Sequence, residues 1–242
     1  MNLIIDVGNT CTKVAVFKGD RLLGKVSVET KNVLKTVKEF QKKYDLIQKS
    51  IVSSVGKLNK KTLNYLEKEF FLQVLSHKTK LPFKNLYSTP KTLGIDRMAL
   101  VCASIDDFSD KNVLIIDAGT CITFDFINDK NEYLGGAISP GIRMRYKALH
   151  DQTANLPLLE TKMPKDIIGN STASSIHSGI MFGLLSEIEG SIERYKQEYA
   201  DLTVILTGGD AKMLSKQLKS SIFANSNFLL EGLNFILQFN SN

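Results

Sequence analysis

The sequence has 242 residues, and 43% of them are hydrophobic, which is ordinary for a globular protein with one large or two smaller domains. Its formal net charge is +6, a mild positive balance that suits an anionic ligand. The three cysteines and three histidines are too few and too scattered for a disulfide framework or a structural zinc site.

No stretch is long and apolar enough to cross a membrane, and the first residues, MNLIIDVGNT, resemble a buried strand rather than a signal peptide. We therefore expect a cytoplasmic protein with no membrane partner. Lysine-rich runs such as KEFQKKYD (38–45) carry much of the positive charge. Because such runs are usually the solvated faces of helices, we expect no nucleic-acid partner either.

The first half of the chain begins with a predicted three-stranded meander. An apolar run, NLIIDV, ends at Gly8 and is followed by TKVAVFK (Thr12 to Lys18) and, after the turn residues KGDR, by LLGKVSV. Helices and strands then alternate. The spacing of the apolar residues predicts helices over 31–44, 59–70 and 95–108, and a short strand over 51–53.

The second half repeats this beginning. The phrase LIIDVGNT (Leu3 to Thr10) returns as LIIDAGT (Leu114 to Thr120), and the strand-like runs CITFDFI and YLGGAIS follow it. The remaining predicted elements are helices over 142–149, 172–199, 211–219 and 228–239 and a strand over 203–206 that ends in TGGD. The repetition predicts a duplication of whole domains, 1–111 and 112–242.

The repeated phrase has the chemistry of a phosphate-binding turn. A strand that ends in a tight glycine turn exposes backbone N–H groups, and glycine permits a positive φ and the close approach of a phosphate. A neighbouring threonine hydroxyl can donate to a phosphate oxygen, and the Asp at the strand end can hold a cation. One such turn is equally typical of an ordinary hairpin. Two of them, each heading a matching meander, favour a cleft that grips a triphosphate from both sides.

In these paired hairpins the sequence resembles the acetate and sugar kinase, heat-shock 70 and actin superfamily, and more narrowly the type III pantothenate kinases. The matching segments run in family order over nearly the whole chain. They are DVGNTCTK (Asp6 to Lys13), LGIDR (Leu93 to Arg97), DAGTCIT (Asp117 to Thr123), GGAISPG (Gly135 to Gly141), TANLP (Thr153 to Pro157), 172–179 and TGGDA (Thr207 to Ala211). Cys121 stands where the family usually has Ala, and Cys11 occupies a variable position.

The resemblance implies an α/β fold of two duplicated ribonuclease H-like (actin-like ATPase) domains. Each domain would contain a mixed five-stranded sheet, and the active site would lie in the cleft between the domains. The implied activity is the ATP-dependent phosphorylation of pantothenate to 4′-phosphopantothenate, the first step of coenzyme A biosynthesis. The implied enzyme is a phosphotransferase with an alcohol group as acceptor, and it acts as a homodimer.

The resemblance also assigns the nucleotide site. The residues that it places against ATP are Asp6, Val7, Gly8, Asn9, Thr10, Cys11, Thr12, Lys13 and Thr120. Mg²⁺ would accompany the ATP, and Asp117 would hold a monovalent cation, K⁺ or NH₄⁺, that the family needs. The alternative for Lys13 is a solvated strand lysine. Gly208, Gly209 and Asp210 would shape the adenine or ribose pocket, but a strand-to-helix turn capped by Asp210 has the same sequence.

The residues that the resemblance places against pantothenate are Tyr87, Gly94, Ile95, Asp96, Arg97 and Thr172. Asp96 would act as the general base that accepts the proton of the primary hydroxyl, and Arg97 would bind the carboxylate. Thr172 would reach the site from the second subunit. From the residues alone, Asp96 and Thr172 are equally helix caps, Arg97 a surface ion pair and Tyr87 a partly buried loop residue. We expect His177 to be packed or at an interface rather than catalytic.

Two other functions fit parts of the sequence. Some relatives of these kinases were first described as accessory factors for gene regulation, in which case the basic surface would be the functional one. Another kinase of the superfamily could act on a sugar or a short carboxylic acid. The LGIDR segment and the two intact phosphate motifs argue against the first alternative, and the LGIDR segment and the short chain argue against the second.

Overall fold

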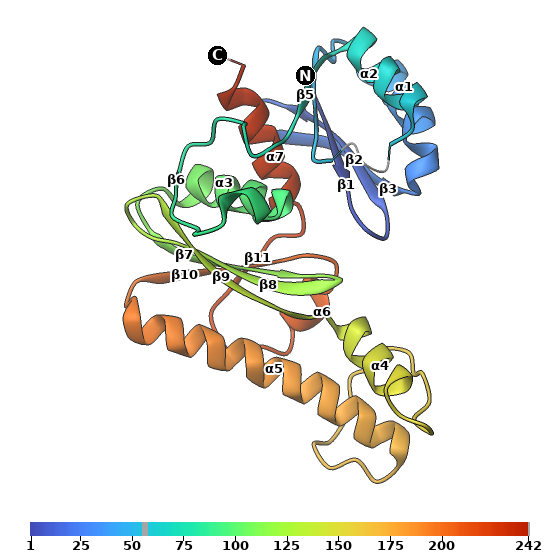
Figure 1. Cartoon of the computed structure of the whole chain (residues 1–242), viewed down its shortest axis with the longest axis vertical. Coiled ribbons are helices and arrows are strands. Elements are labelled where there is room, and N and C mark those ends of the chain that lie inside the picture. The colour runs from blue at the N-terminus through green and yellow to red at the C-terminus, as the bar shows by residue number, and fades with distance from the viewer. Residues whose placement is uncertain (55–57, 242) are drawn as a thin grey trace. The chain divides into compact units, whose positions relative to one another are not determined.

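The computed structural model describes residues 1–54 and 58–241. The chain divides into two compact units. The first consists of Met1–Ser109, Asn131–Tyr133 and Asn227–Asn242, and the second of Asp110–Lys130 and Leu134–Ser226. Each unit is built around a mixed sheet (Figure 1).

The sheet of the first unit has five strands in the order β3-β2-β1-β4-β5. Strands β1 (Asn2–Val7), β2 (Thr12–Lys18) and β3 (Arg21–Val28) form the predicted antiparallel meander. Strands β4 (Lys49–Val52) and β5 (Phe71–Val74) then extend the sheet in parallel on the other side of β1. The central strand is therefore the one that ends at the first phosphate motif.

Strand β1 is apolar without alternation because both faces of its sheet are covered. Leu3 and Ile5 belong to the core that the sheet shares with α1 (Val33–Lys43) and α2 (Lys60–Glu69). Ile4 belongs to the core on the opposite face, which the sheet shares with α3 (Ile95–Phe108) and α7 (Phe228–Phe239). This packing on both faces fixes the end of β1, where Asp6 lies, and the start of α3, where Asp96 lies.

The C-terminal helix α7 belongs to the first unit although it follows the second unit in sequence. It lies beside α3 (Figure 1), and a Cβ atom placed on Gly232 would be only 2.0 Å from the Ala99 carbonyl oxygen. The sequence analysis placed this tail, 228–239, in a domain of residues 112–242. The structure differs because the apolar face of α7 is covered by α3 and the first sheet.

The sheet of the second unit follows the same plan as the first. Its strands are β7 (Asn112–Ala118), β8 (Cys121–Ile127), β9 (Glu132–Pro140), β10 (Leu202–Thr207) and β11 (Phe223–Ala224). Their order, β9-β8-β7-β10-β11, repeats the order of the first sheet strand for strand. The predicted duplication is thus confirmed in the topology, with the second phosphate motif again at the end of the central strand.

The second sheet contains one strand more than the five that were expected. Strand β6 (Lys84–Asn85) pairs in parallel with the first residues of β9, Glu132 and Tyr133, which belong to the first unit. The pairing is short and consists of polar residues, so no apolar periodicity could predict it. The other two short strands that the sequence analysis missed, β5 and β11, lie at sheet edges.

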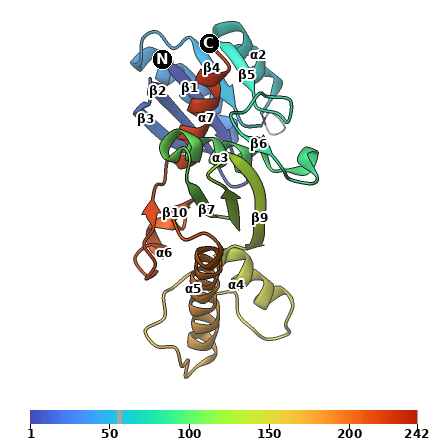
Figure 2. The ribbon, with the colours of Figure 1, turned by 90° about the vertical axis from the view of Figure 1, so that its left-hand side faces the viewer.

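The second unit has three helices, of which the sequence predicts the first two closely. They are α4 (Ile142–Asp151), α5 (Thr172–Glu198) and α6 (Ala211–Leu214). The long helix α5 packs against the sheet and reaches α4 (Figures 1 and 2), and its residues Ile180, Leu184 and Ile188 lie in the core. The helix expected over 211–219 is wrong beyond Leu214, where the chain continues as turns. Among the described residues, no helix is long and apolar enough to span a membrane.

Candidate active site

The first phosphate motif is the turn between β1 and β2. Asp6 is the register partner of Lys13, and the turn closes where the Gly8 N–H donates to the Cys11 carbonyl at 3.1 Å. A Cβ atom on Gly8 would lie 2.9 Å from that same carbonyl oxygen. Glycine is therefore needed here for the close approach of two backbone segments. The positive φ that the sequence analysis also considered is not used at Gly8.

Asp6 is buried, with 7% of its surface exposed, and it is held by polar neighbours. The Ser53 hydroxyl donates to Asp6 Oδ1 at 3.1 Å and accepts from the Val7 N–H at 2.8 Å. Lys13 Nζ lies 4.0 Å from Asp6 Oδ2. Burial raises the pKa of Asp6 from its ordinary value, although Lys13 and Ser53 act in the opposite direction. The carboxylate is therefore poorly solvated and would gain from a further cation nearby.

The predicted ATP residues of this motif divide into an exposed and a buried group. Asn9 and Thr10 are exposed at the tip of the turn, and Cys11 is partly exposed. Thr12 is fully buried, and its hydroxyl lies 3.0 Å from the hydroxyl of Thr30. The side chain of Thr12 thus ties β2 to the start of α1, so a contact between Thr12 and a nucleotide would have to use its backbone.

The start of α3 presents the predicted base. Asp96 is exposed in the first turn of this helix, and its Oδ1 accepts a hydrogen bond from the Arg97 N–H at 2.9 Å. A Cβ atom on the preceding Gly94 would lie 2.4 Å from that oxygen, so glycine leaves room for the carboxylate. The N-cap of α3 is Gly94, so Asp96 is not the cap residue; its carboxylate accepts from one backbone N–H of the first turn and still faces solvent.

Arg97 is buried, with 5% of its surface exposed, which excludes the surface ion pair considered in the sequence analysis. Its guanidinium carbon lies 5.7 Å from the centre of the Tyr87 ring, within the range of cation–π contacts. The Tyr87 ring lies in turn 6.1 Å from that of Tyr133. The structure thus brings together two predicted substrate residues, Tyr87 and Arg97, that are ten positions apart in the sequence.

The phosphate motif and the predicted base are also electrostatically coupled within the first unit. The negative charge of Asp96 contributes to the raised pKa of Asp6. Such coupling between carboxylates requires that they lie near one another. Asp6 at the end of β1 therefore lies within electrostatic range of Asp96 at the start of α3, where Arg97 is the next residue.

The second phosphate motif is the turn between β7 and β8. Asp117 is the register partner of Thr123, and the Gly119 N–H donates to the Cys121 carbonyl at 2.9 Å. Register partners on antiparallel strands project to the same face. The buried hydroxyl of Thr123 has no hydrogen-bond partner among the residues that the structure describes. An oxygen-rich position therefore lies beside Asp117, with no lysine opposite it.

Two other glycine segments of the family pattern pack onto this second turn. Gly208 has a φ of +97°, and a Cβ atom there would be 2.4 Å from Asp117 Oδ1 and 2.3 Å from the Ala118 carbonyl. The Asp210 N–H donates to that same carbonyl at 3.0 Å, and the Gly141 N–H donates to the Thr120 carbonyl at 3.1 Å. TGGDA and GGAISPG thus support the turn from two sides.

Asp210 does not use its side chain as a helix cap. It is the N-cap residue of α6 but accepts no capping hydrogen bond there, and burial raises the pKa of its carboxyl group. The alternative in which the Asp210 side chain caps the turn between strand and helix is therefore wrong.

Thr172 lies at the start of α5 but is not its N-cap. That position belongs to Ser171, whose hydroxyl accepts from the Ser174 N–H while the Ser174 hydroxyl accepts from the Ser171 N–H. Thr172 is exposed, so its side chain is available for another role. His177 of the same helix is packed as expected, with Nδ1 2.6 Å from the Tyr146 hydroxyl.

Sequence reasoning missed two side chains of these turns. Ser53 orients Asp6, and Thr123 stands opposite Asp117. Ser53 was predicted as the last residue of the strand over 51–53, but in the structure it directly follows β4, which ends at Val52. Thr123 fell within the quoted DAGTCIT motif, but only the strand register shows that it pairs with Asp117.

The cations of a kinase fit the chemistry of these turns. Among the described residues, no three His, Cys, Asp or Glu side chains gather in one place, so Mg²⁺ would take most of its ligands from phosphate and water. The buried Thr123 hydroxyl without a partner and the Asp117 carboxylate are oxygen donors of the kind that a cation prefers. The backbone of Gly208 packs against that carboxylate and leaves no room for a side chain there.

Comparison with known proteins agrees with these motifs. The family model described as type III pantothenate kinase matches residues 2–194. Proteins named type III pantothenate kinase from Christiangramia forsetii and Flavobacterium johnsoniae are 55% and 47% identical to this chain. The first alignment covers 99% of both chains, and the second covers 99% of this chain and 98% of its relative.

Solved structures extend the likeness to the fold. A Baf family protein from Campylobacter jejuni, titled as a candidate transcriptional activator, is 21% identical with a TM-score of 0.63 over 98% of both chains. A glucokinase from an Antarctic psychrotroph is 9% identical with a TM-score of 0.53, also over 98% of both chains. At these identities the structures show the fold alone, that of the actin-like sugar kinases. The family model and the full-length relatives show more: the chain belongs to the type III pantothenate kinase family.

Proposed function

We propose that the chain transfers the γ-phosphate of ATP to the primary hydroxyl of pantothenate, with Asp96 as the general base. The family to which it belongs phosphorylates pantothenate in coenzyme A biosynthesis, and as a kinase it uses ATP with a divalent metal ion. The product is 4′-phosphopantothenate. The observation that carries the assignment of residues is the start of α3, where exposed Asp96 adjoins Arg97, buried against Tyr87, in the same unit as the Asp6 turn.

The residues of the first turn and of the start of α3 would each support one part of the reaction. The phosphate would lie at the turn tip, where Asn9 and Thr10 are exposed and Lys13 supplies positive charge. Asp96, exposed at the start of α3, would accept the hydroxyl proton as that oxygen attacks phosphorus. Arg97, held against the Tyr87 ring, offers a planar fork of donors for the pantothenate carboxylate. Alignment and charge neutralisation would then supply most of the rate.

The second turn would complete the nucleotide site. We assign Thr120 to an ATP contact and Asp117 to a monovalent cation, K⁺ or NH₄⁺, which would add positive charge near the polyphosphate. The support is the oxygen-donor set of the Asp117 carboxylate and the Thr123 hydroxyl. Asp210, which is not engaged as a cap, would face the ribose or adenine together with Gly208 and Gly209.

We also propose that the enzyme acts as a homodimer in which Thr172 contacts the pantothenate of the other subunit. The supporting observation is that Thr172 is exposed at the start of α5 while Ser171 caps the helix. The cytoplasmic location and the absence of a nucleic-acid partner stay predictions. The gene-regulatory alternative has only a likeness of fold in its favour.

The test is the turnover of Asp96→Asn with ATP and pantothenate. We expect this variant to bind ATP normally and to lose about a hundredfold or more of kcat, the usual effect of removing a general base. Asp107→Asn, on the same helix but at its other end, is the matched control and should keep its rate. Full turnover by Asp96→Asn would refute the base, and phosphorylation of sugars instead of pantothenate would refute the substrate.

A further inference from the structure

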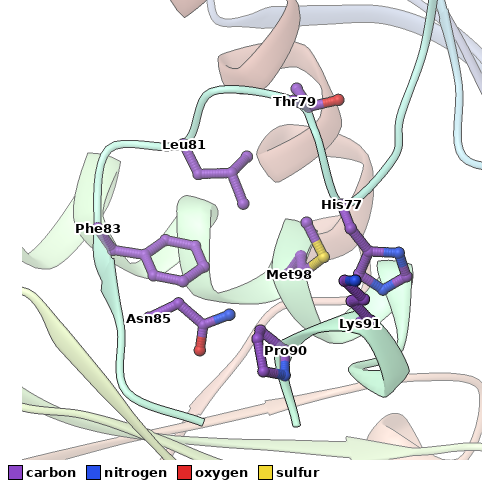
Figure 3. Close-up of a pocket in the computed structure, with 8 residues that line it drawn as sticks. All are labelled: His77, Thr79, Leu81, Phe83, Asn85, Pro90, Lys91 and Met98. Carbon is purple, nitrogen blue, oxygen red and sulfur yellow. The ribbon is translucent and has the colours of Figure 1, made fainter. Parts of the chain in front are cut away.

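The first unit contains a cavity that none of the assigned site residues lines. It has a volume of about 350 Å³ and lies on the segment that joins β5 to α3 (Figure 3). Small-molecule sites typically have volumes of about 300–1,000 Å³. The cavity is therefore large enough for a ligand of its own.

One part of its wall is apolar. The side chains of Leu81, Phe83 and Met98 point into the same space (Figure 3). Met98 is almost completely buried, and Leu81 and Phe83 are partly buried against the core that lies beneath α3 and α7. This wall is fixed by the core, so it would present a preformed surface to the apolar body of a ligand.

The other part of the wall carries donors and positive charge. Lys91 and His77 lie side by side across the cavity from Phe83 (Figure 3). Lys91 forms no ion pair with any residue in 1–54 or 58–241, and it is exposed. Asn85 adds an amide on the opposite side, next to Phe83 (Figure 3). One uncompensated ammonium beside an apolar wall is complementary to a ligand with one negative charge and a hydrocarbon body.

We propose that this cavity is a second small-molecule site and that its ligand is a short-chain monocarboxylate. The carboxylate would accept hydrogen bonds from Lys91, and the hydrocarbon chain would fill the space between Leu81, Phe83 and Met98. An inorganic anion would leave the apolar wall uncovered, and a neutral apolar molecule would leave the ammonium without a partner.

Two residues that line the cavity form hydrogen bonds with the segment that carries the assigned substrate residues. The Leu93 carbonyl can only accept, so His77 Nε2, at 2.8 Å from it, carries a proton and donates. Leu93 directly precedes Gly94 at the start of α3. On the other side, Asn85 Oδ1 accepts from the Tyr87 N–H at 2.9 Å. Rearrangement of His77 or Asn85 around a ligand would therefore reach Asp96, Arg97 and Tyr87, a coupling that rests on the proposed function.

The experiment is calorimetric titration of the whole protein with hexanoate and, separately, with hexanamide, which has the same chain but no charge. We expect saturable binding of hexanoate that is retained in excess pantothenate, and much weaker binding of hexanamide. Lys91→Met keeps the length of the side chain and removes its charge, so it should weaken hexanoate about tenfold. Lys78→Met, an exposed lysine of the same segment that does not line the cavity, should bind as the wild type does.

Four results would each overturn the site: no hexanoate binding, equal binding of hexanamide, unchanged binding by Lys91→Met, or displacement of hexanoate by pantothenate. The last would place hexanoate at the substrate site instead. None of these measurements requires turnover. Hexanoate binding by a protein that does not phosphorylate pantothenate would contradict the proposed function and leave the cavity assignment intact.

Discussion

The two Asp-led turns occupy the same place in the same topology, yet they differ at the position that faces the carboxylate. Asp6 pairs with Lys13, seven residues on, whereas Asp117 pairs with Thr123, six residues on, so the first turn has one residue more. In the first turn the carboxylate faces an ammonium group. In the second it faces a hydroxyl without a partner among the described residues.

This difference shows how one duplicated element can serve two kinds of ligand. A lysine beside the first turn supplies its own positive charge and suits a phosphate. The second turn presents a carboxylate beside a hydroxyl, and both are oxygen ligands of the kind that a cation takes. The two carboxylates are also contacted differently. Asp6 accepts a hydrogen bond from Ser53, whereas the backbone of Gly208 packs closely against Asp117.

The largest effect should come from breaking the second turn at Gly208. In Gly208→Val, a Cβ atom would meet both the Ala118 carbonyl and the Asp117 carboxylate at a φ of +97°, which side chains rarely adopt. We expect a loss of about 3 kcal/mol in the free energy of unfolding, measured by urea denaturation. Gly209→Ala is the control, because its Cβ would meet nothing within 4 Å. Equal stability of the two variants would show that the turn does not need this contact.

The sequence predicts the outline of both turns because their physics is local. A buried apolar strand, an Asp and a tight glycine turn are all encoded in consecutive residues, and so are the amphipathic helices α1, α2 and α5. The resemblance to a family added the roles of Tyr87, Asp96 and Arg97. The stacking of Arg97 on Tyr87 then became visible only in the structure.

Most of the misses are matters of tertiary contact. The β6 pairing, the attachment of α7 to the first unit and the Thr12–Thr30 contact each join residues far apart in the sequence or outside any apolar pattern. The choice of Ser171 over Thr172 as the N-cap of α5 depends on a reciprocal hydrogen bond with Ser174. A sequence with several neighbouring capping residues does not decide between them.

The next effect concerns the lysine that distinguishes the first turn. Lys13→Met should raise the KM for ATP about tenfold, because a charge-assisted contact with phosphate is lost. Steady-state kinetics with varied ATP measure it. Lys18→Met, at the exposed end of the same strand, should keep the wild-type KM. If the two variants behave alike, Lys13 is the solvated strand lysine of the alternative interpretation.

The burial of Asp6 predicts how stability depends on pH. Burial raises the pKa of Asp6 above its ordinary value of 3.8, so the folded protein holds the proton more tightly than the unfolded chain does. The contribution of Asp6 to the free energy of unfolding is thus greatest below pH 3.8, and it is lost as the pH rises through the raised pKa. Asparagine does not ionise, so Asp6→Asn does not lose stability in this way. The free energy of unfolding of the variant minus that of the wild type should therefore increase from about pH 4 to about pH 7.

Urea denaturation at both pH values measures this difference. Asp45→Asn makes the same change of charge at an exposed position and is the control. If the stability of Asp6→Asn relative to the wild type stays constant or falls over this interval, the carboxylate is not destabilised by burial. The first turn would then already have its charge balanced by Lys13.

The smallest effect should come from the hydroxyl that faces Asp117. Without a cation, Thr123→Val should leave the free energy of unfolding unchanged or raise it, because a buried hydroxyl that has no described partner costs stability. K⁺ should raise the free energy of unfolding of both proteins. The K⁺ concentration that gives half of this gain should be about fivefold higher for the variant than for the wild type. Thr12→Val in the first turn breaks the contact with Thr30, so it should lose stability at every K⁺ concentration alike.

If K⁺ stabilises wild type and Thr123→Val equally, the hydroxyl is not part of a cation site. The contrast between the two turns would then rest on Lys13 alone.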